Sequence, residues 1–270
     1  MLVQFDPKNV SNIYAQAPFP YFEDVLEIAY DAASHRAFFY TNSQTVDTYN
    51  TLTLQALGRV VLPFRSHPAS AFHFDTKTNG LWFVFPDDGA VDVCYLGADD
   101  TSGVLVCAPA HSVHGVYSYV RDASAFDAAS RTLAATVNGG PDASPMLLVW
   151  HVDTPAAAAP VPLADLCQNM KAITGTSGTI EFVCVSFTFN TLARVNLQTG
   201  ALQPIAELPF LENPNLLTST VYKTSYYTQL YGAIDYTWTE IDVQSGKTVN
   251  SSTISVTQIP ELAFCTYIAD

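Results

Sequence analysis

Charged side chains are scarce in this sequence, and basic ones are the scarcest. Lysine and arginine together number 11 against 25 aspartates and glutamates, which gives a net charge of −14 at pH 7. A nucleic-acid partner requires a basic surface, so this balance argues against one. The same deficit disfavours adsorption to an anionic membrane. An acidic surface of this kind favours solubility and attracts cations.

The sequence also lacks an apolar run long enough to cross a membrane, so we expect no membrane insertion. Its first residues, Met1–Asp6, have neither the basic segment nor the apolar core of a signal peptide. Two N-glycosylation sequons begin at Asn9 and Asn250 and are compatible with secretion. We therefore expect an extracellular or cell-surface glycoprotein.

Recognisable catalytic and metal motifs are missing as well. The chain has no Gly-x-Ser-x-Gly, no phosphate-binding or dinucleotide-binding glycine loop and no His-Glu-x-x-His. No acidic loop has the calcium spacing of an EF-hand. Without a Cys-x-x-Cys, zinc-ribbon and thioredoxin-type sites are not indicated either. These absences favour a non-enzymatic role over a catalytic one.

Five cysteines are present: Cys94, Cys107, Cys167, Cys184 and Cys265. Cys94 and Cys107 flank a predicted hairpin whose turn lies near Asp100 and Thr101, and a two-residue turn there would place them directly opposite each other. They then form either a disulfide or a pair of buried small apolar residues. The odd total leaves at least one thiol free or paired with another chain.

Proline marks an internal repeat. An apolar residue followed by proline recurs six times, at Ala17-Pro18, Leu62-Pro63, Ala108-Pro109, Val161-Pro162, Leu208-Pro209 and Ile259-Pro260. The steps between successive prolines are 45, 46, 53, 47 and 51 residues. This period is typical of the four-stranded blade of a β-propeller. Proline at the outer edge of a blade costs little, because an edge strand has free N–H positions.

Each step has the same internal order of strand, polar turn and apolar strand. The turns Asp31–Arg36 and Asp127–Arg131 are nearly identical, and their Asp and Ser side chains suit bonds to the turn backbone. The predicted first strands are Val25–Tyr30, Ala71–Phe74, Gly115–Val120, Met170–Ile173 and Thr218–Tyr222. The predicted second strands are Ala37–Tyr40, Leu81–Phe85, Thr132–Val137, Ile180–Phe187 and Gln229–Ile234.

The pattern predicts one all-β domain over residues 1–270, a six-bladed propeller whose closing blade is shared between the two chain ends. Leu262–Ala269 would supply its first strand, Leu2–Asp6 its third and Ser11–Ala17 its fourth, so the second is missing. Three explanations are open: the blade has three strands, the chain is part of a longer precursor, or a neighbouring molecule donates a strand. Donation between identical subunits would give rings or filaments.

The loops after the prolines converge on one mouth of the central channel, which makes their polar side chains the candidate site. Carboxylates, amides and imidazoles there could hold a metal ion or a polar ligand, or could simply cap loops and face water. His73, on a first strand, is expected to be a hydrogen-bonded structural histidine, and Trp82, Trp150 and Trp238 are expected to pack between blades. The candidate mouth residues are Glu23, His67, His111, His114, Asn169, Glu212 and Glu261.

Two segments carry a family resemblance, Asp127–Leu133 and Ile241–Thr248. They resemble the superfamily of six- and seven-bladed propellers that includes the YVTN-type and the SMP-30/gluconolactonase-like proteins. The resemblance implies the propeller fold over the whole chain. The lactonase-like members hold a divalent metal in the channel with glutamate, asparagine and aspartate, but those ligands cannot be matched residue by residue here.

Two functions follow as hypotheses. The first is a secreted or surface propeller without a cofactor, which binds a protein partner or assembles with itself through the incomplete closing blade. The alternative is a metal-dependent lactonase or esterase-type hydrolase with a divalent ion such as calcium at the channel mouth, where the ion would polarise a carbonyl or activate water.

Overall fold

The computed structural model describes most of the chain in thirteen segments. In this part of the chain every regular element is a β-strand. The described residues are 2–6, 9–17, 25–65, 68–87, 90–111, 123–139, 144–154, 160–174, 179–186, 188–208, 216–222, 224–231 and 235–255.

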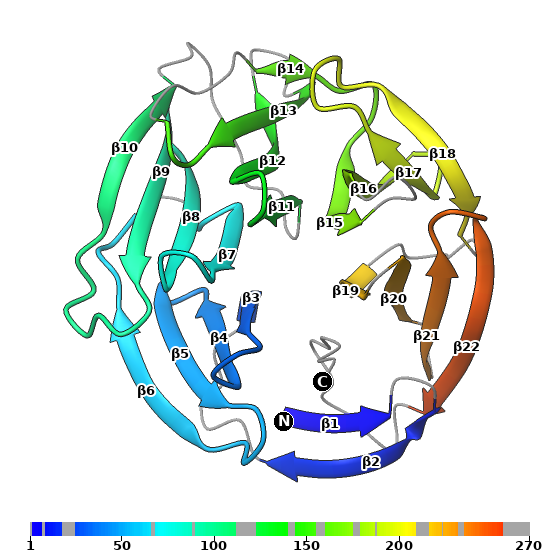
Figure 1. The fold of residues 1–270 in the computed structure, drawn as a ribbon, viewed down its shortest axis with the longest axis horizontal. Coiled ribbons are helices and arrows are strands. Elements are labelled where there is room, and N and C mark those ends of the chain that lie inside the picture. Colours follow the sequence, from blue (N-terminus) through cyan, green and yellow to red (C-terminus); the bar gives the residue numbers. More distant parts are fainter. Residues whose placement is uncertain are drawn as a thin grey trace.

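Five antiparallel four-stranded sheets follow one another along the sequence and stand around a common axis, which confirms the β-propeller (Figure 1). The first strand of each sheet lies nearest the axis and the fourth lies at the rim. Blade 1 comprises β3 (Val25–Asp31), β4 (Arg36–Thr41), β5 (Thr45–Asn50) and β6 (Ala56–Val61). Blade 2 comprises β7 (Ala71–Asp75), β8 (Gly80–Asp87), β9 (Ala90–Gly97) and β10 (Val106–His111).

The other three blades have the same strand order, in which each strand pairs with the next one along the chain. Blade 3 comprises β11 (Ser124–Asp127), β12 (Thr132–Gly139), β13 (Ser144–His151) and β14 (Val161–Pro162). Blade 4 comprises β15 (Cys167–Thr174), β16 (Ile180–Ser186), β17 (Thr191–Val195) and β18 (Leu202–Glu207). Blade 5 comprises β19 (Leu216–Tyr222), β20 (Ser225–Tyr231), β21 (Asp235–Asp242) and β22 (Lys247–Ser255).

The predicted count of six blades is wrong, because the described residues form five four-stranded blades. Six prolines delimit five intervals, and each interval holds one such sheet. The N-terminal residues form a separate two-stranded sheet of β1 (Leu2–Asp6) and β2 (Asn9–Ala17), with β2 beside β22 (Figure 1). This pairing confirms the two N-terminal strands expected for the closing sector. The strand predicted at 262–269 lies outside the described residues.

Two of the predicted strands needed correction. The first strand of blade 3 is β11, which ends directly at the Asp127 turn, whereas the predicted segment 115–120 lies outside the described residues. In blade 5, β20 begins at Ser225 and ends at Tyr231, earlier than the predicted Gln229–Ile234. Both errors arose where the apolar run is interrupted by polar residues and the period alone does not fix the strand.

The turns between first and second strands take the conformation that their sequence predicts. The Asp31 carboxylate accepts hydrogen bonds from the backbone N–H groups of Ala33 and Ser34, and Asp127 does the same for the two matching residues of its own turn. The last residue of each of these two turns is left-handed, with φ of 52° at His35 and 59° at Arg131. The matching turn of blade 2, between β7 and β8, ends in the same conformation, with φ of 48° at Asn79. The aspartate therefore fixes where the second strand begins.

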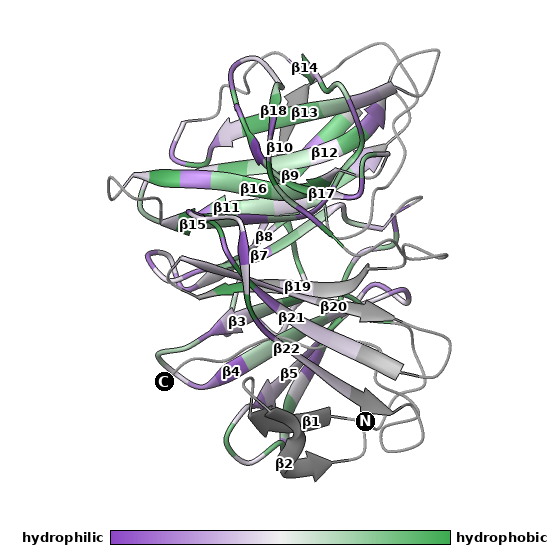
Figure 2. Ribbon diagram, turned by 90° about the vertical axis from the view of Figure 1, so that its right-hand side faces the viewer, coloured by the Kyte–Doolittle hydropathy of each residue, from purple (hydrophilic) through white to green (hydrophobic). Residues whose placement is uncertain are grey.

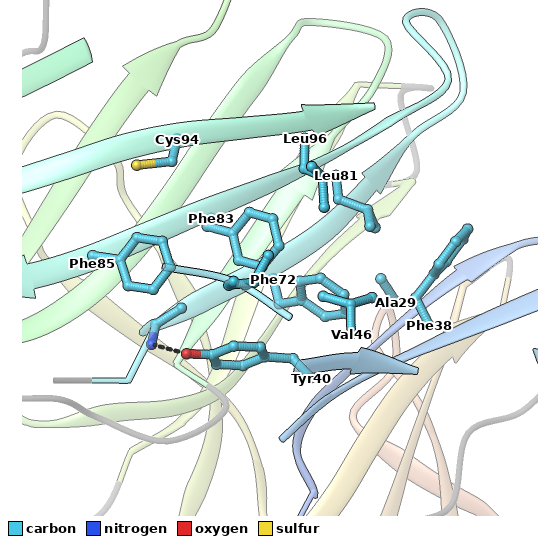
Figure 3. Close-up of a cluster of buried hydrophobic side chains, with 12 residues drawn as sticks. Ala29, Phe38, Tyr40, Val46, Phe72, Leu81, Phe83, Phe85, Cys94 and Leu96 are labelled. Atoms are coloured by element: carbon cyan, nitrogen blue, oxygen red, sulfur yellow. Dashed lines mark hydrogen bonds between the residues drawn. The ribbon is translucent and has the colours of Figure 1, made fainter. Parts of the chain in front are cut away.

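Apolar clusters fill the boundaries between successive blades, and hydrophilic residues gather at the hairpin turns (Figure 2). Between blades 1 and 2, the rings of Tyr40, Phe72 and Phe83 pack with centroids 5.0–5.8 Å apart (Figure 3). The Tyr40 hydroxyl accepts a hydrogen bond from the Ala69 N–H at 3.2 Å. Trp150 packs in the cluster between blades 2 and 3, with Trp82 partly buried against it, as predicted.

Arginine side chains connect neighbouring blades near the outer turns. Arg36 of blade 1 donates hydrogen bonds to Asp99 and Asn79 of blade 2, at 2.7 and 3.0 Å. Arg131 of blade 3 pairs with the fully buried Asp75 of blade 2 at 2.5 Å. Arg194 of blade 4 donates to a backbone carbonyl of blade 5 at 2.9 Å. Each of these contacts spans a boundary that the apolar clusters fill.

Three glycines bring an outer turn of one blade against the last strand of the blade before it. Gly103, Gly200 and Gly246 all have positive φ, between 68° and 71°. A Cβ at these positions would lie 2.1, 2.2 and 2.3 Å from the carbonyl oxygens of Val61, Pro162 and Ile205, respectively. No side chain fits there, so glycine is required both for the backbone angle and for the close approach.

We expect Gly246→Ala to lower the free energy of unfolding by about 2 kcal/mol or more, because it combines an unfavourable φ with a clash against backbone. Gly58→Ala is the matched control, since nothing lies within 4 Å of a Cβ built at Gly58. Urea unfolding of both variants measures the difference. Equal stabilities would show that the turn of blade 5 does not depend on this contact.

Candidate functional site

The predicted channel-mouth residues are mostly outside the described part of the chain, so the mouth as a site stays a prediction. Glu23, His67, His114, Glu212 and Glu261 belong to this group. His111 is the last residue of β10, at the rim strand of blade 2, where a loop position was expected. Asn169 is the only predicted mouth residue whose side chain is described, and it lies on β15 rather than in a loop.

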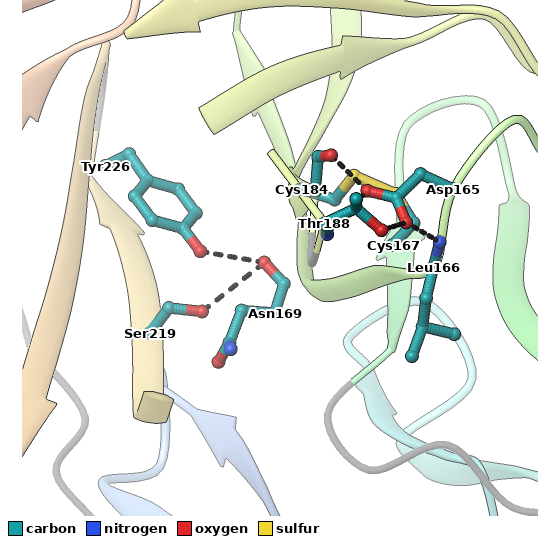
Figure 4. Close-up of a disulfide and its surroundings, with 9 residues drawn as sticks. Asp165, Leu166, Cys167, Asn169, Cys184, Thr188, Ser219 and Tyr226 are labelled. Carbon is teal, nitrogen blue, oxygen red and sulfur yellow. Dashed lines mark hydrogen bonds between the residues drawn. A yellow bond between two sulfur atoms is a disulfide. The ribbon is translucent and has the colours of Figure 1, made fainter. Parts of the chain in front are cut away.

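Asn169 occupies an unusual position on the axial strand of blade 4. Its φ is +51°, and the β15–β16 register shifts around it. Its backbone carbonyl accepts hydrogen bonds from the Tyr226 hydroxyl at 2.9 Å and the Ser219 hydroxyl at 3.4 Å, which hold the bulge against blade 5 (Figure 4). The residue is only 2% exposed, yet its side-chain Oδ1 has no hydrogen-bond partner among the residues that the structure describes. An unpaired buried amide oxygen is costly, and a bound donor or cation would satisfy it.

A histidine–serine pair joins the axial strands of blades 2 and 3. His73 Nε2 lies 2.9 Å from the Ser124 hydroxyl oxygen, and the imidazole stacks on Phe126. Burial and the nearby Lys171 ammonium lower the pKa of His73 to about 3. The imidazole is therefore neutral and a weak base at physiological pH, and Ser124 is almost fully buried. The structure thus shows the hydrogen bond expected for His73, whose side chain is partly buried on the axial strand β7.

The buried carboxylates of Asp75 and Asp47 are also engaged in hydrogen bonds and ion pairs within the protein. Asp75 accepts hydrogen bonds from Thr78, Trp82 and the backbone N–H of Lys77, in addition to its ion pair with Arg131. Burial by itself would raise the pKa of Asp75, but the bonds from Arg131, Thr78 and Trp82 outweigh it and hold that pKa below its ordinary value. Asp47, which is 1% exposed, is bound in two-pronged fashion by Arg59 at 2.6 and 2.9 Å.

Two disulfides are present among the described residues. Cys94 and Cys107 lie directly opposite each other on β9 and β10 and are bonded, so the structure has the disulfide of the two alternatives left open by the sequence. Their hairpin loop is longer than the two-residue turn we expected. The second bond, Cys167–Cys184, was not predicted: it joins β15 to β16 beside the register shift at Asn169, which sequence spacing does not reveal. Disulfides are typical of oxidising compartments.

A groove of about 1020 Å³ lies between blades 3 and 4 on the side of the outer turns. Its polar groups are largely paired with one another or with backbone. Arg194 Nε donates to Glu181 at 2.7 Å, and the side-chain oxygen of Asn196 accepts two backbone N–H groups of its own turn. Among the described lining residues, Arg194, Glu181 and Asn196 are therefore already engaged within the fold.

Among the described residues, six of the eight large exposed apolar side chains belong to the outer strands and turns of blades 1 and 2. Phe64 is 89% exposed and Val61 is 67% exposed, and the turn containing Gly103 touches the Val61 carbonyl, which brings the two blades together there. We call this surface the blade 1–2 rim. Its exposed members are Leu52, Leu57, Val61, Phe64, Val104 and Val106; elsewhere in the described part of the chain only Phe189 and Val249 are comparable.

The comparisons with known proteins assign no family to this chain. No protein-family model matches the chain, and no curated protein matches its sequence. The resemblance to YVTN-type and SMP-30-like proteins therefore remains a prediction, and the propeller itself is what the structure supports. In the described residues, no helix has the length and apolar character needed to cross a membrane.

The low pKa of the partly buried His73 predicts a pH dependence of stability. The unfolded chain binds a proton at this histidine with an ordinary pKa near 6.5, whereas the folded chain does not until about pH 3. Stability is therefore lost as pH falls from 6.5 towards 3, by at most about 1.4 kcal/mol per pH unit for this one proton. His73→Gln keeps a hydrogen-bonding group near Ser124 but cannot titrate.

Urea unfolding at a series of pH values measures this effect. We expect the wild type to lose stability between pH 6.5 and 4.5, and His73→Gln to be flatter over that range. Below about pH 4 both proteins lose stability, because Asp31, Asp75 and Asp165 have lowered pKa values in the folded state and must then be protonated. Parallel curves for the two proteins above pH 4.5 would show that His73 is not the titrating group.

Proposed function

We propose that this chain is a non-enzymatic, extracellular β-propeller that acts through protein–protein contact, with a second copy of itself as the partner. The observation that carries the proposal is the exposed apolar blade 1–2 rim. Monomeric soluble proteins rarely expose large apolar side chains in a group, and such groups mark interaction surfaces. The two disulfides support a role in an oxidising, extracellular setting.

The rim is held rigidly, which suits a docking surface. The backbone around Phe64 is fixed by Gln44, whose side chain bonds both the N–H and the carbonyl of Arg65, at 2.6 and 2.7 Å. Arg65 in turn pairs with Asp92 of blade 2 at 2.7 Å. A surface that is already ordered loses little conformational entropy when a partner binds.

Charge favours a second copy as the occupant. The chain carries a net charge of −14, so most of its surfaces repel one another. Beneath and beside the rim, however, the buried Asp47 is paired with Arg59 and the partly exposed Asp92 with Arg65. Two copies that meet there bring apolar side chains together without opposing these carboxylates. A contact of the same patch on both subunits gives a closed two-fold dimer.

Sedimentation and electron microscopy of the purified protein test this proposal, with a rim variant, Leu57→Lys/Val61→Lys, beside the wild type. Both side chains are more than half exposed, so the fold should tolerate the change. We expect the wild type to self-associate and the rim variant to dissociate at least tenfold more readily. Val249→Lys is the matched control, because Val249 is 59% exposed on the rim strand of blade 5.

The outcomes separate the routes of assembly. A wild type that stays monomeric at all concentrations would contradict the proposal. If the rim variant still associates, as rings or filaments, the contact lies at the two-stranded sheet of β1 and β2 and not at the rim. The edges of that sheet are the other expected route of self-assembly.

A second candidate function is a metal-dependent hydrolase of the lactonase or esterase type. The observation in its favour is the buried, unpartnered Oδ1 of Asn169 on an axial strand, because amide oxygens are ligands that calcium accepts. The other ligands would come from the predicted mouth residues. A divalent ion held there would supply a Lewis acid for a carbonyl substrate.

Calcium titration by calorimetry and thermal unfolding tests the second candidate. If it is right, calcium raises the Tm of the wild type, and Asn169→Gly removes most of the shift. Glycine keeps the left-handed backbone at this position and deletes only the side chain. Heat of binding that is equal in both proteins, or absent from both, would rule out a calcium site that uses Asn169.

A further inference from the structure

The Cys94–Cys107 disulfide differs from Cys167–Cys184 in its surroundings. Cys94 is fully buried, but Cys107 on the rim strand β10 is only half-buried, between the exposed Val106 and the end of the strand. In contrast, Cys167 and Cys184 are both fully buried in the cluster between blades 3 and 4. Among the four bonded cysteines Cys107 alone is not fully buried, so a thiol in solution can approach the first bond only from the Cys107 side.

A guanidinium group lies against the first disulfide. Arg65 Nη2 is 3.2 Å from the Cys107 sulfur and 3.6 Å from the Cys94 sulfur. The same side chain pairs with Asp92 through Nη1 and lies over the Phe85 ring at 5.1 Å, so its position is fixed from three sides. A fixed cation stabilises a thiolate on either of the two sulfurs that it lies against, and a stabilised thiolate is a better leaving group in disulfide exchange. Because Cys94 is fully buried and Cys107 is not, attack falls on Cys107 and the sulfur that leaves is that of Cys94.

The two cysteine Cα atoms are 4.0 Å apart, closer than in most disulfide-bonded pairs. This spacing follows from their place in the sheet, where they are directly opposite on adjacent antiparallel strands. Opening the bond lets the two sulfurs separate without breaking the pairing of β9 and β10.

We propose that Cys94–Cys107 is a thiol-exchange site, at which a low-molecular-weight thiol attacks Cys107 and Cys94 leaves as a thiolate beside Arg65. This inference does not require the partner-binding proposal, but it concerns the monomer, because Val106 of the blade 1–2 rim is next to Cys107 and a second copy bound there would cover it. In the first step a bond forms between the attacking sulfur and Cys107, the Cys94–Cys107 bond breaks, and its electron pair stays on Cys94. A second thiol then attacks the reagent's sulfur and releases Cys107. Two thiols are oxidised to one disulfide, and their two protons pass to the cysteines.

Exchange at this bond has a consequence for the ring. The disulfide closes the chain segment between Cys94 and Cys107, and Gly103, which contacts the Val61 carbonyl of blade 1, lies in that segment. Reduction therefore removes a constraint from the contact between blades 1 and 2. We expect faster hydrogen exchange in residues 98–105 of the reduced protein than in the oxidised one.

The test is a titration of the native protein with glutathione, followed by acid quenching, alkylation and peptide mass spectrometry. We expect Cys94 and Cys107 to be reduced at a glutathione concentration at least tenfold below that for Cys167 and Cys184. The mixed disulfide should be found on Cys107 rather than Cys94. Cys265 lies in a separate peptide and is counted apart. Reduction of both disulfides at the same concentration, or of Cys167–Cys184 first, would overturn the proposal, and this comparison needs no variant.

A pair of variants tests the part assigned to Arg65. Arg65→Gln should slow the exchange several-fold, because the Cys94 thiolate loses its neighbouring charge, and Arg65→Lys should retain most of the rate. Thermal unfolding of the oxidised variants verifies that both are folded. An unchanged or faster rate in a folded Arg65→Gln variant would contradict the role of the guanidinium.

Discussion

The packing of each blade against the next is the interaction on which the rest of this structure depends. A four-stranded blade has two apolar faces and cannot bury either of them alone, so its stability comes from its neighbours. From blade 1 to blade 5 there are four boundaries between successive blades, and an apolar cluster fills each of them. Arginines and glycines then add contacts at the outer turns of successive blades. These contacts between blades are made by many of the polar and charged side chains of the described residues.

That use of polar groups shapes the functional argument. Charged residues are few in this sequence, and several of the buried ones hold blades or turns: Asp75 binds Arg131, Asp47 binds Arg59, and Asp165 binds Ser186 and Thr188. His73 is neutral and bonded to Ser124. Outside these networks, the described residues include the exposed apolar side chains of the blade 1–2 rim and the half-buried Cys107. The proposed protein contact and the proposed thiol exchange rest on these groups.

Much of the architecture was predictable because it follows from a local pattern that repeats along the sequence. The proline period located the blades, and the Asp turns located the starts of second strands. The predicted number of blades was one too high, because each four-stranded blade lies between two prolines and six prolines delimit five blades. Contacts between residues far apart in sequence gave no local signal: Arg131 reaches Asp75 in another blade, and Cys167 meets Cys184 across a register shift. The candidate mouth was inferred from the loop positions of a generic propeller, and His111 and Asn169 proved to lie on strands.

Native-state hydrogen exchange of the intact protein tests the dependence on blade boundaries most directly. The boundaries between successive blades hold large apolar clusters. The face of blade 1 that is turned away from blade 2 has a smaller described cluster of four buried residues, Val25, Ala37, Phe39 and Tyr49. The account predicts that amides of the central strands β8, β12 and β16 exchange together, only through global unfolding, and that those of β1 and β2 exchange by an opening of lower free energy. Protection of β1 and β2 equal to that of the central strands would contradict it.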